Sequence, residues 1–232
     1  MKTTPCELQS ERLRQIKSGE TWLNAPLKER PAVVLHLIPV QTPQDQALCQ
    51  LPEHPWLLAN LPLLHASFSG PVEYDVNGVH RVAKQGDEVV SYMQLFVNGC
   101  IEAVDLRLPH YLNSHAETFE KTLLDATRSY LRVQQEMKAI FPVEVTFCLL
   151  NAVHTSLGVE DQSLPRERVR EWWESGCCGE ITDAEVCLRA LVASHDDDDL
   201  ERPMKTVFDS LWRASGYPRS PHYNQAGERG RA

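Results

Sequence analysis

The sequence predicts an α+β fold, a largely antiparallel sheet of five to seven strands with a long helix on one face and additional terminal helices. Two alternating stretches are each interrupted by Asn-Gly, which is typical of β-hairpins. A continuous apolar run between two prolines is typical of a strand buried on both faces. An apolar stripe with helical spacing over residues 119–140 fits a helix that covers a sheet.

The composition is that of a globular protein: 232 residues, of which 42% are hydrophobic and 24% charged. This length makes one large domain or two small ones. Because no repeat or low-complexity linker is visible, we expect a single domain over residues 31–232, with a loosely ordered tail after about residue 225. Residues 1–30 are expected to form an N-terminal docking helix and a linker.

The first expected element is a short helix with clear end signals. Thr4 suits the N-cap, Pro5 the first helical position, and Glu7 completes a capping box. Gly19 is a suitable C-terminal stop. The apolar stripe is narrow and so short a helix is unstable alone, so we expect it to dock on the body or on another chain.

The buried strand is expected over residues 31–39, with His36 interpreted as a hydrogen-bonded core histidine. Residues 39–65 contain five prolines and are expected to be irregular surface chain.

The first hairpin is expected over residues 72–83, with a two-residue turn at Asn77-Gly78. One face should be core and the other solvated. The expected pairs are Val76 with Val79, Val72 with Ala83, and Asp75 with His80.

The second hairpin is expected over residues 89–106, with its turn at Asn98-Gly99. Both faces carry apolar residues, so this hairpin should be central and covered on each side. The expected pairs are Val97/Cys100, Leu95/Glu102 and Met93/Val104 on one face, and Phe96/Ile101, Gln94/Ala103 and Tyr92/Asp105 on the other.

A long helix is expected from His115 to Phe141, opened by a capping box of Ser114 and Glu117. Pro142 ends it, and residues 143–153 follow as a strand. The long intervening helix allows this strand to lie parallel to a hairpin strand. The remaining expected elements are a helix over 166–174, a strand over 186–192 and a helix over 202–214.

Seven cysteines are scattered along the chain, an odd number and too sparse for a disulfide scaffold. Cys100 and Cys148 fall in apolar strands and are interpreted as small core residues. Cys177, Cys178 and Cys187 are the one cluster, and they lack zinc-ligand spacing. We therefore expect reduced thiols and no metal.

Sequence motifs for catalysis are weak. His154-Thr-Ser156-Leu-Gly158 lacks the first glycine and the following helix of a hydrolase nucleophile elbow. His195 precedes four aspartates, Asp196–Asp199, whose consecutive spacing does not suit a Ca²⁺ loop. Neither GxxxxGK[ST] nor GxGxxG occurs, so no cofactor is expected.

Candidate binding residues come from the second hairpin and from a tryptophan pair. Glu102, on an otherwise apolar face, is interpreted either as a partnered buried acid or as a functional acid. The tryptophan pair suits either a contact surface or a cover for the open end of the sheet. The candidates are Tyr92, Gln94, Glu102, Asp105, Trp172 and Trp173.

The charge balance restricts the partners. Twenty-three basic and thirty-two acidic residues give a net charge of −9, which disfavours binding to nucleic acid or an anionic membrane by bulk charge. No apolar run approaches the length of a membrane span and no signal-peptide core is present, so we expect no membrane association and a cytoplasmic location.

Six segments in a familiar order carry a resemblance to a known family. They are Val33–Pro39, Tyr92–Asp105, Ile181–Val192, Leu200–Pro203, Phe208–Gly216 and Tyr217–Asn224. The chain resembles the C-terminal region of bacterial Schlafen/Alba-domain proteins, a family of ATP-binding or helix-turn-helix proteins, without the Alba domain itself. The family's activities belong to that domain, so the resemblance implies no catalytic residue here. It implies a module that functions together with another domain or chain.

The sequence therefore favours a non-enzymatic binding or regulatory module that acts through protein–protein contacts, with a nuclease or ATPase as one kind of effector. The partner is expected to be another protein chain or a second copy. One alternative is a nucleic-acid-binding accessory protein with a local basic groove. The other is a metal-assisted hydrolase that uses Glu102, Asp105 or the aspartates near His195.

Overall fold

The computed structural model describes residues 4–40, 61–64, 70–139, 141–158, 179–194, 197–224 and 229. The predicted helix over 166–174, the tryptophan pair Trp172-Trp173 and His195 lie outside the described residues, as does most of the predicted loop over 39–65.

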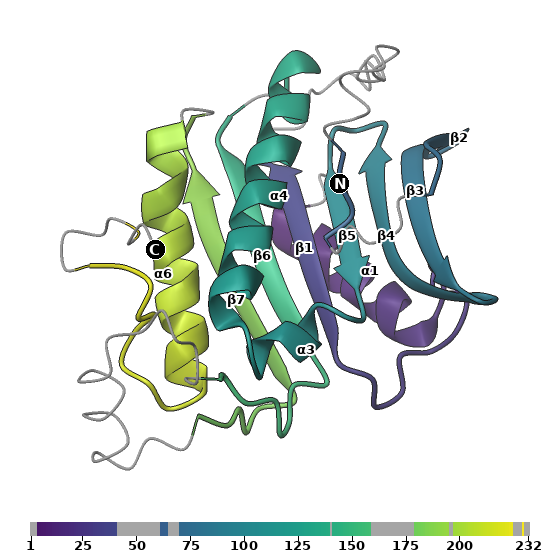
Figure 1. Cartoon of the computed structure of the whole chain (residues 1–232). Coiled ribbons are helices and arrows are strands. Elements are labelled where there is room, and N and C mark those ends of the chain that lie inside the picture. Colours follow the sequence, from purple (N-terminus) through teal and green to yellow (C-terminus); the bar gives the residue numbers. More distant parts are fainter. Residues whose placement is uncertain are drawn as a thin grey trace.

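In the described residues, one sheet of seven strands forms the body of the protein, and each of its strand pairs is antiparallel. The strand order is β2-β3-β4-β5-β1-β6-β7 (Figure 1). The predicted α+β class with a largely antiparallel sheet is confirmed. The strands are β1 (Ala32–Pro39), β2 (Glu73–Asp75), β3 (Gly78–Gln85), β4 (Glu88–Phe96), β5 (Ile101–Asp105), β6 (Val143–Leu150) and β7 (Glu185–Val192).

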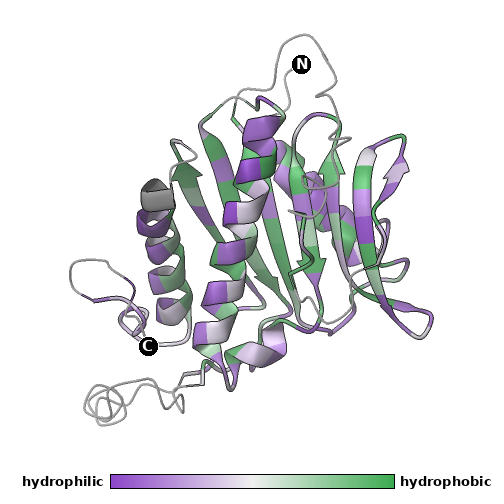
Figure 2. Cartoon of the chain, turned by 45° about the horizontal axis from the view of Figure 1, so that its top comes forward, coloured by the Kyte–Doolittle hydropathy of each residue, from purple (hydrophilic) through white to green (hydrophobic). Residues whose placement is uncertain are grey.

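Helices cover both faces of this sheet (Figure 1). The long helix α4 (Ala116–Glu136) and the C-terminal helix α6 (Asp197–Ala214) lie on one face, and the short helix α3 (Pro109–Leu112) leads into α4. Helix α1 (Pro5–Ser18) lies on the opposite face. Hydrophobic residues concentrate on the strands, while the outward sides of α4 and α6 are hydrophilic (Figure 2).

The ends of α1 follow from the predicted capping residues. The backbone N–H of Glu7 donates to the Thr4 hydroxyl at 3.2 Å, and the Glu7 carboxylate accepts from the backbone N–H of Thr4 at 2.8 Å. Gly19 ends the helix with φ of 78°. The helix docks on the sheet of its own chain, where Leu13 and Ile16 join a small apolar cluster. The sequence alone leaves open whether it docks there or on another chain.

Strand β1 is buried along all eight residues, as its apolar run predicts. It lies between β5 and β6 and pairs antiparallel with both. Strands β5 and β6 therefore run in the same direction, with β1 between them and α4 in the connection. As predicted, β6 runs parallel to a hairpin strand, β5, but these two strands are not paired with each other.

The predicted register of the first hairpin is wrong by two residues, because the turn lies one residue earlier than predicted. Asp75 pairs with Gly78, so Val76 and Asn77 form the turn and Val76 is 91% exposed. The Asp75 carboxylate causes the shift, because it accepts from the backbone N–H groups of Asn77 and Gly78, both at 2.8 Å. Gly78 has φ of 146° at the start of β3.

We expect Gly78→Ala to lower the free energy of unfolding by about 1–3 kcal/mol, because a side chain there meets both a positive φ and the backbone. Its Cβ would lie 2.0 Å from the carbonyl oxygen of Leu95. Urea denaturation followed by circular dichroism measures the change. Gly86→Ala is the matched control, because Gly86 also has positive φ, at 63°, but no atom lies within 4 Å of the position that a methyl group would take there. Equal losses in the two variants would contradict the contact with Leu95.

The second hairpin is shifted by one residue from its predicted register. Its loop has three residues, 97–99, and Phe96 donates its backbone N–H to the carbonyl of Cys100 at 2.8 Å. Gly99 takes φ of 81°, which suits a type I turn followed by a left-handed residue. Gln94 consequently pairs with Glu102, in place of the predicted pair of Leu95 with Glu102. A shift of one residue moves each side chain of a strand to the other face relative to its partner.

The predicted capping box of α4 does not form. His115 is the N-cap and makes no side-chain cap, while the Ser114 hydroxyl bonds Nδ1 of His115 at 2.7 Å. The helix ends at Glu136, five residues before the predicted end at Phe141. Lys138 then takes φ of 58°, a left-handed conformation that breaks the helix before Pro142.

Two cysteines pair across β6 and β7, contrary to the prediction of reduced thiols. Cys148 and Cys187 are directly opposite in the register, with their Cα atoms 4.2 Å apart, and form a disulfide. Neither sequence spacing nor composition indicates this pair, because the strands that carry it meet only in the folded sheet. Cys6 is exposed and is not part of this disulfide, Cys100 is buried, and Cys177 and Cys178 lie outside the described residues.

Candidate functional site

Three of the predicted site residues meet on the face that α1 covers. Tyr92 and Gln94 are two apart on β4, and Glu102 on β5 pairs with Gln94. His36 on β1 pairs with Glu102 and adds an imidazole to the group. Strands β1, β4 and β5 therefore place four polar side chains beneath one short helix.

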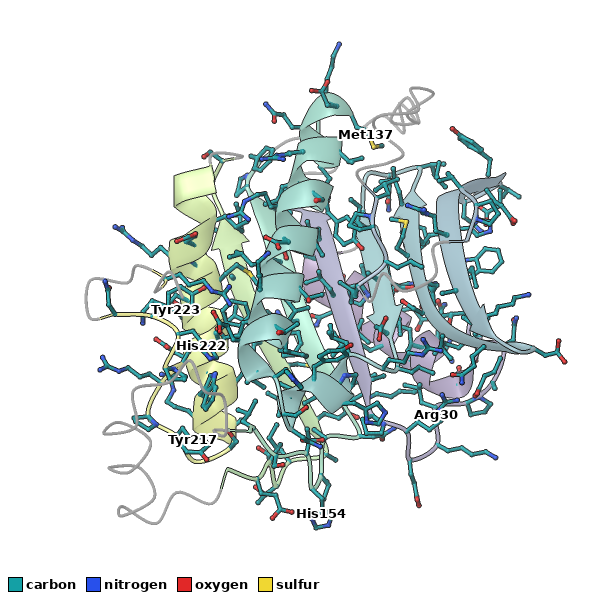
Figure 3. The ribbon with its side chains drawn as sticks, viewed as in Figure 1. Arg30, Met137, His154, Tyr217, His222 and Tyr223 are labelled. Carbon is teal, nitrogen blue, oxygen red and sulfur yellow. A yellow bond between two sulfur atoms is a disulfide. The ribbon has the colours of Figure 1, made fainter. Side chains whose placement is uncertain are left out.

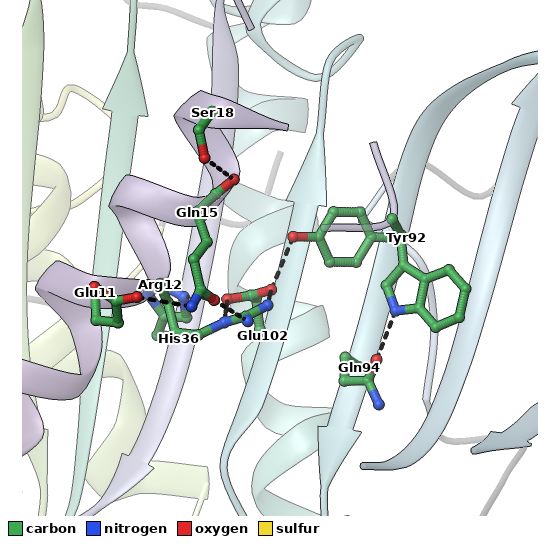
Figure 4. A network of polar contacts seen from close by, with 9 residues as sticks. Glu11, Arg12, Gln15, Ser18, His36, Tyr92, Gln94 and Glu102 are labelled. Carbon is green, nitrogen blue, oxygen red and sulfur yellow. Dashed lines mark hydrogen bonds and ion pairs between the residues drawn. The ribbon is translucent and has the colours of Figure 1, made fainter. Parts of the chain in front are cut away.

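Glu102 is the centre of this group and is fully buried. Arg12 of α1 binds it with two hydrogen bonds, from Nε to Oε2 at 2.8 Å and from Nη2 to Oε1 at 2.6 Å (Figure 4). Nε2 of His36 lies 2.9 Å from Oε2, and the Tyr92 hydroxyl donates to Oε1 at 2.8 Å. We call Arg12, His36, Tyr92 and Glu102 the carboxylate cluster.

These contacts keep Glu102 ionised. Burial acts to raise its pKa, but the hydrogen bonds and charges of Arg12 and His36 outweigh burial and lower the pKa to about 2. Burial and the negative charge of Glu102 raise the pKa of Tyr92 well above its ordinary value. At neutral pH the carboxylate accepts and the phenol donates. Both Glu102 oxygens are occupied by protein donors, so the cluster is suited to docking α1 rather than to transferring protons to a substrate.

Neighbouring side chains of α1 hold Arg12 in place. Its Nη1 donates to Oε1 of Gln15 at 2.5 Å, and Gln15 in turn donates to Glu11 at 2.8 Å (Figure 4). The guanidinium also lies 5.0 Å from the centre of the Phe96 ring. Arg12 is therefore fixed from its own helix and from β4, which suits bidentate binding of a carboxylate.

Asp105 does not belong to the carboxylate cluster. It pairs with Ser91, so it faces the opposite side of the sheet from Glu102. Its Oδ1 accepts from the backbone N–H groups of Arg107 and Leu108, at 2.8 and 2.7 Å, just before α3. The structure therefore places Glu102 and Asp105, the carboxylates named in the hydrolase alternative, on opposite faces of the sheet.

A groove of about 500 Å³ lies beside the carboxylate cluster, where β3 meets the segment after α1. This volume is in the range of small-ligand and peptide side-chain sites. We call it the Trp22 groove. Its lining residues are Trp22, Asn24, Gly70, Pro71, Glu73, His80, Val82, Ala83, Lys84 and Val89.

An aromatic pair forms one wall of the Trp22 groove. The Trp22 and His80 rings are stacked, with centres 3.9 Å apart and planes at 19°. The indole Nε1 of Trp22 donates to Oε1 of Gln94 at 2.6 Å (Figure 4). Gln94 thus connects the groove wall to the strand that carries Tyr92.

Two carboxylates lie beside His80 in this wall. Nε2 of His80 lies 3.4 Å from Glu73 and its Nδ1 lies 3.7 Å from Asp75. The Glu73 side chain is 62% exposed, so its carboxylate faces solvent at the groove. Nδ1 of His80 and Nε2 of Gln94 are buried and have no hydrogen-bond partner in the described part of the chain.

Sequence reasoning missed another buried carboxylate, Glu120 on α4. Its Oε1 accepts from the indole of Trp212 at 2.8 Å and from the hydroxyl of Ser220 at 2.7 Å. Nδ1 of His222 lies 3.0 Å from its Oε2. Tyr217, His222 and Tyr223 belong to the segment that follows α6, and this segment lies beside the helix (Figure 3). This group is closed from solvent and anchors residues 215–223 to the two helices.

The other predicted motifs do not form a catalytic arrangement in the described residues. His154 is exposed and contacts Glu180, and the Ser156 hydroxyl lies 3.3 Å from the Asn113 side chain. Across the described ranges, no group of three or more His, Cys, Asp or Glu is placed to hold a metal ion. None of the helices seen in this part of the chain has the length and apolar character needed to cross a membrane.

No protein-family model matches this sequence, and no curated protein matches it significantly. The resemblance to the C-terminal region of Schlafen/Alba-domain proteins therefore stays a prediction.

Proposed function

We propose that this chain is a non-enzymatic binding module whose Trp22 groove holds a basic segment of a partner protein. The observation that carries the proposal is the combination, in one groove, of the Trp22 indole and the solvent-facing carboxylate of Glu73. An aromatic face beside a carboxylate is a favourable environment for an ammonium or guanidinium group.

The geometry suits an arginine or lysine side chain of an extended peptide. One face of the Trp22 ring is stacked on His80, and the ring also lines the groove. Val82 and Val89 supply apolar surface for the aliphatic stem of such a side chain. The Gln94 side chain fixes the orientation of the Trp22 indole, since it accepts the hydrogen bond from Nε1.

Two further observations support binding rather than catalysis. Glu102 is enclosed by protein donors, and Asp105 is buried on the other face of the sheet. The net charge of −9 favours association with a basic partner. The predicted family relation points in the same direction, because it implies a module that serves another chain, such as a nuclease or ATPase effector.

Fluorescence anisotropy tests this proposal with labelled octapeptides. One library carries one or two arginines or lysines in neutral sequences, and a matched library carries glutamate at the same positions. We expect the wild-type chain to bind members of the basic library selectively. Glu73→Lys should weaken this binding about tenfold, which corresponds to about 1.4 kcal/mol. Lys84→Glu should strengthen it, because it removes the lysine that lines the groove.

Glu136→Lys is the matched control, because it makes the same charge change at an exposed position on the far face of the sheet. Binding in that variant should equal wild type at moderate salt. The proposal is wrong if no basic peptide binds, or if Glu73→Lys and Glu136→Lys weaken binding equally. Preferential binding of a labelled oligonucleotide, strengthened by Glu73→Lys, would instead favour the nucleic-acid alternative.

A further inference from the structure

Three cysteines gather where the first turns of α1 cross the sheet edge. The Cys148–Cys187 disulfide joins β6 to β7, with Cys148 fully buried and Cys187 exposed. Cys6, in the first turn of α1, is free and exposed. An exposed disulfide sulfur and an exposed thiol are the two groups that thiol–disulfide exchange requires.

Contacts from α1 place Cys6 over the same strand as Cys187. Nη2 of Arg189 donates to Sγ of Cys6 at 3.4 Å. Arg189 and Cys187 are two apart on β7, so they share a face and their Cα atoms are about 7 Å apart. Lys17, at the other end of α1, bonds Glu185 on the same face at 2.5 Å. The helix therefore spans the position of Cys187.

A second contact reaches the buried sulfur. Nε2 of Gln9 donates to Sγ of Cys148 at 3.4 Å, and Gln9 follows Cys6 by three residues on the same side of the helix. A hydrogen-bond donor therefore lies beside each sulfur that would carry charge during exchange, Arg189 at the attacking sulfur and Gln9 at the leaving one.

We propose that Cys6, Cys148 and Cys187 form a thiol–disulfide exchange site that links α1 covalently to β7 in one of its two states. The Cys6 thiol loses its proton to solvent, and its sulfur forms a bond to Sγ of Cys187. The bond between the sulfurs of Cys187 and Cys148 breaks, and the Cys148 thiolate takes a proton from solvent. One disulfide is exchanged for another, so the step needs no oxidant or reductant.

The two states differ in how α1 is held. With the Cys148–Cys187 bond, hydrogen bonds, ion pairs and apolar packing hold α1 to the sheet. With a Cys6–Cys187 bond, the N-terminal end of α1 is tied to the edge strand, while β6 and β7 lose their covalent link. Which two cysteines form the disulfide therefore determines whether α1, the helix that carries Arg12, is covalently tied to the sheet.

Disulfide mapping tests the exchange in the full chain with Cys49, Cys177 and Cys178 replaced by serine. The oxidised protein is incubated overnight at pH 8 without added thiol, acid-quenched, denatured and alkylated with N-ethylmaleimide. Mass spectrometry of a non-reducing digest should find a Cys6–Cys187 linked peptide, together with maleimide on Cys148. In Cys6→Ser, Cys148 should remain unalkylated.

Two further variants test the roles of the neighbours. Arg189→Gln should slow formation of the Cys6–Cys187 peptide about tenfold, the effect of losing a hydrogen bond to a charged group. Cys100→Ser should leave the rate unchanged, because Cys100 is buried in the hairpin loop. The proposal is overturned if Cys148 stays unalkylated in the parent chain, or if Cys148 is alkylated equally in Cys6→Ser.

Discussion

Glu102→Ala is expected to lower the free energy of unfolding by about 3–5 kcal/mol, the usual cost of removing one partner from a buried ion pair. Arg12 would lose both hydrogen bonds to a carboxylate, and Tyr92 would lose the acceptor of its buried hydroxyl. Urea denaturation followed by circular dichroism and tryptophan fluorescence measures the loss.

Two control variants separate the charge from general damage to α1. Glu20→Ala removes an exposed carboxylate just after the same helix and should change stability far less than Glu102→Ala. Arg12→Met keeps the aliphatic stem but leaves the carboxylate with two donors, so it should cost nearly as much as Glu102→Ala. A loss below about 1 kcal/mol in Glu102→Ala would show that the carboxylate cluster does not hold α1.

The same carboxylate predicts a specific acid sensitivity. Its pKa in the folded chain is about 2, against an ordinary value of 4.5, so folding favours the ionised form. The resulting stabilisation, about 3 kcal/mol, is present in full above about pH 4.5 and is lost as the pH falls toward 2. Glu102→Gln should remove this part of the pH dependence. Stability curves with the same slope below pH 4.5 in both proteins would contradict the assignment.

Trp212→Ala is the second substitution with a large expected effect, about 3–5 kcal/mol. Trp212 is fully buried, packs against Tyr217 and His222, and donates to Glu120. Its removal creates a cavity between α4 and α6 and leaves the buried Glu120 with one hydrogen-bond donor fewer. Chemical denaturation measures the loss of stability.

Limited trypsin digestion shows where the Trp212→Ala chain opens. We expect faster cleavage after Arg213 and Arg219, because the segment over 215–223 loses its anchor. Trp212→Phe is the control, because it keeps most of the buried ring area and loses the N–H donor. It should cost roughly half as much as Trp212→Ala. Equal cleavage in wild type and Trp212→Ala would contradict an anchoring role for this group.

Elements with local signals could be predicted from the sequence. The capping box of α1 uses residues three apart, and β1 is marked by its own apolar run between prolines. The hairpins lie where the sequence predicts them, but their registers differ from the predicted ones. Asn-Gly indicates that a turn occurs, whereas the Asp75 carboxylate and the left-handed Gly99 determine which residues close it.

The register error matters most for the candidate site. The sequence predicts Tyr92, Gln94 and Glu102 as site residues, but on opposite faces of the hairpin, and the one-residue shift brings them together. Arg12 could not be predicted as the partner of Glu102, because 90 residues separate them and only the docking of α1 joins them. The groups around Glu120 could not be predicted for the same reason, since Ser220 lies 100 residues away.

The interior position of β1 has a consequence for synthesis of the chain on the ribosome. Residues 32–39 are completed early, whereas their partner strands end at Asp105 and Leu150. The ribosome adds about 5–20 residues per second, so this strand lacks both of its partner strands for several seconds after its own synthesis. Its apolar run, interrupted only by His36, is the kind of extended hydrophobic segment that chaperones bind, so we expect the nascent chain to need one. Translation speed between residues 40 and 150 should therefore affect the yield of folded protein.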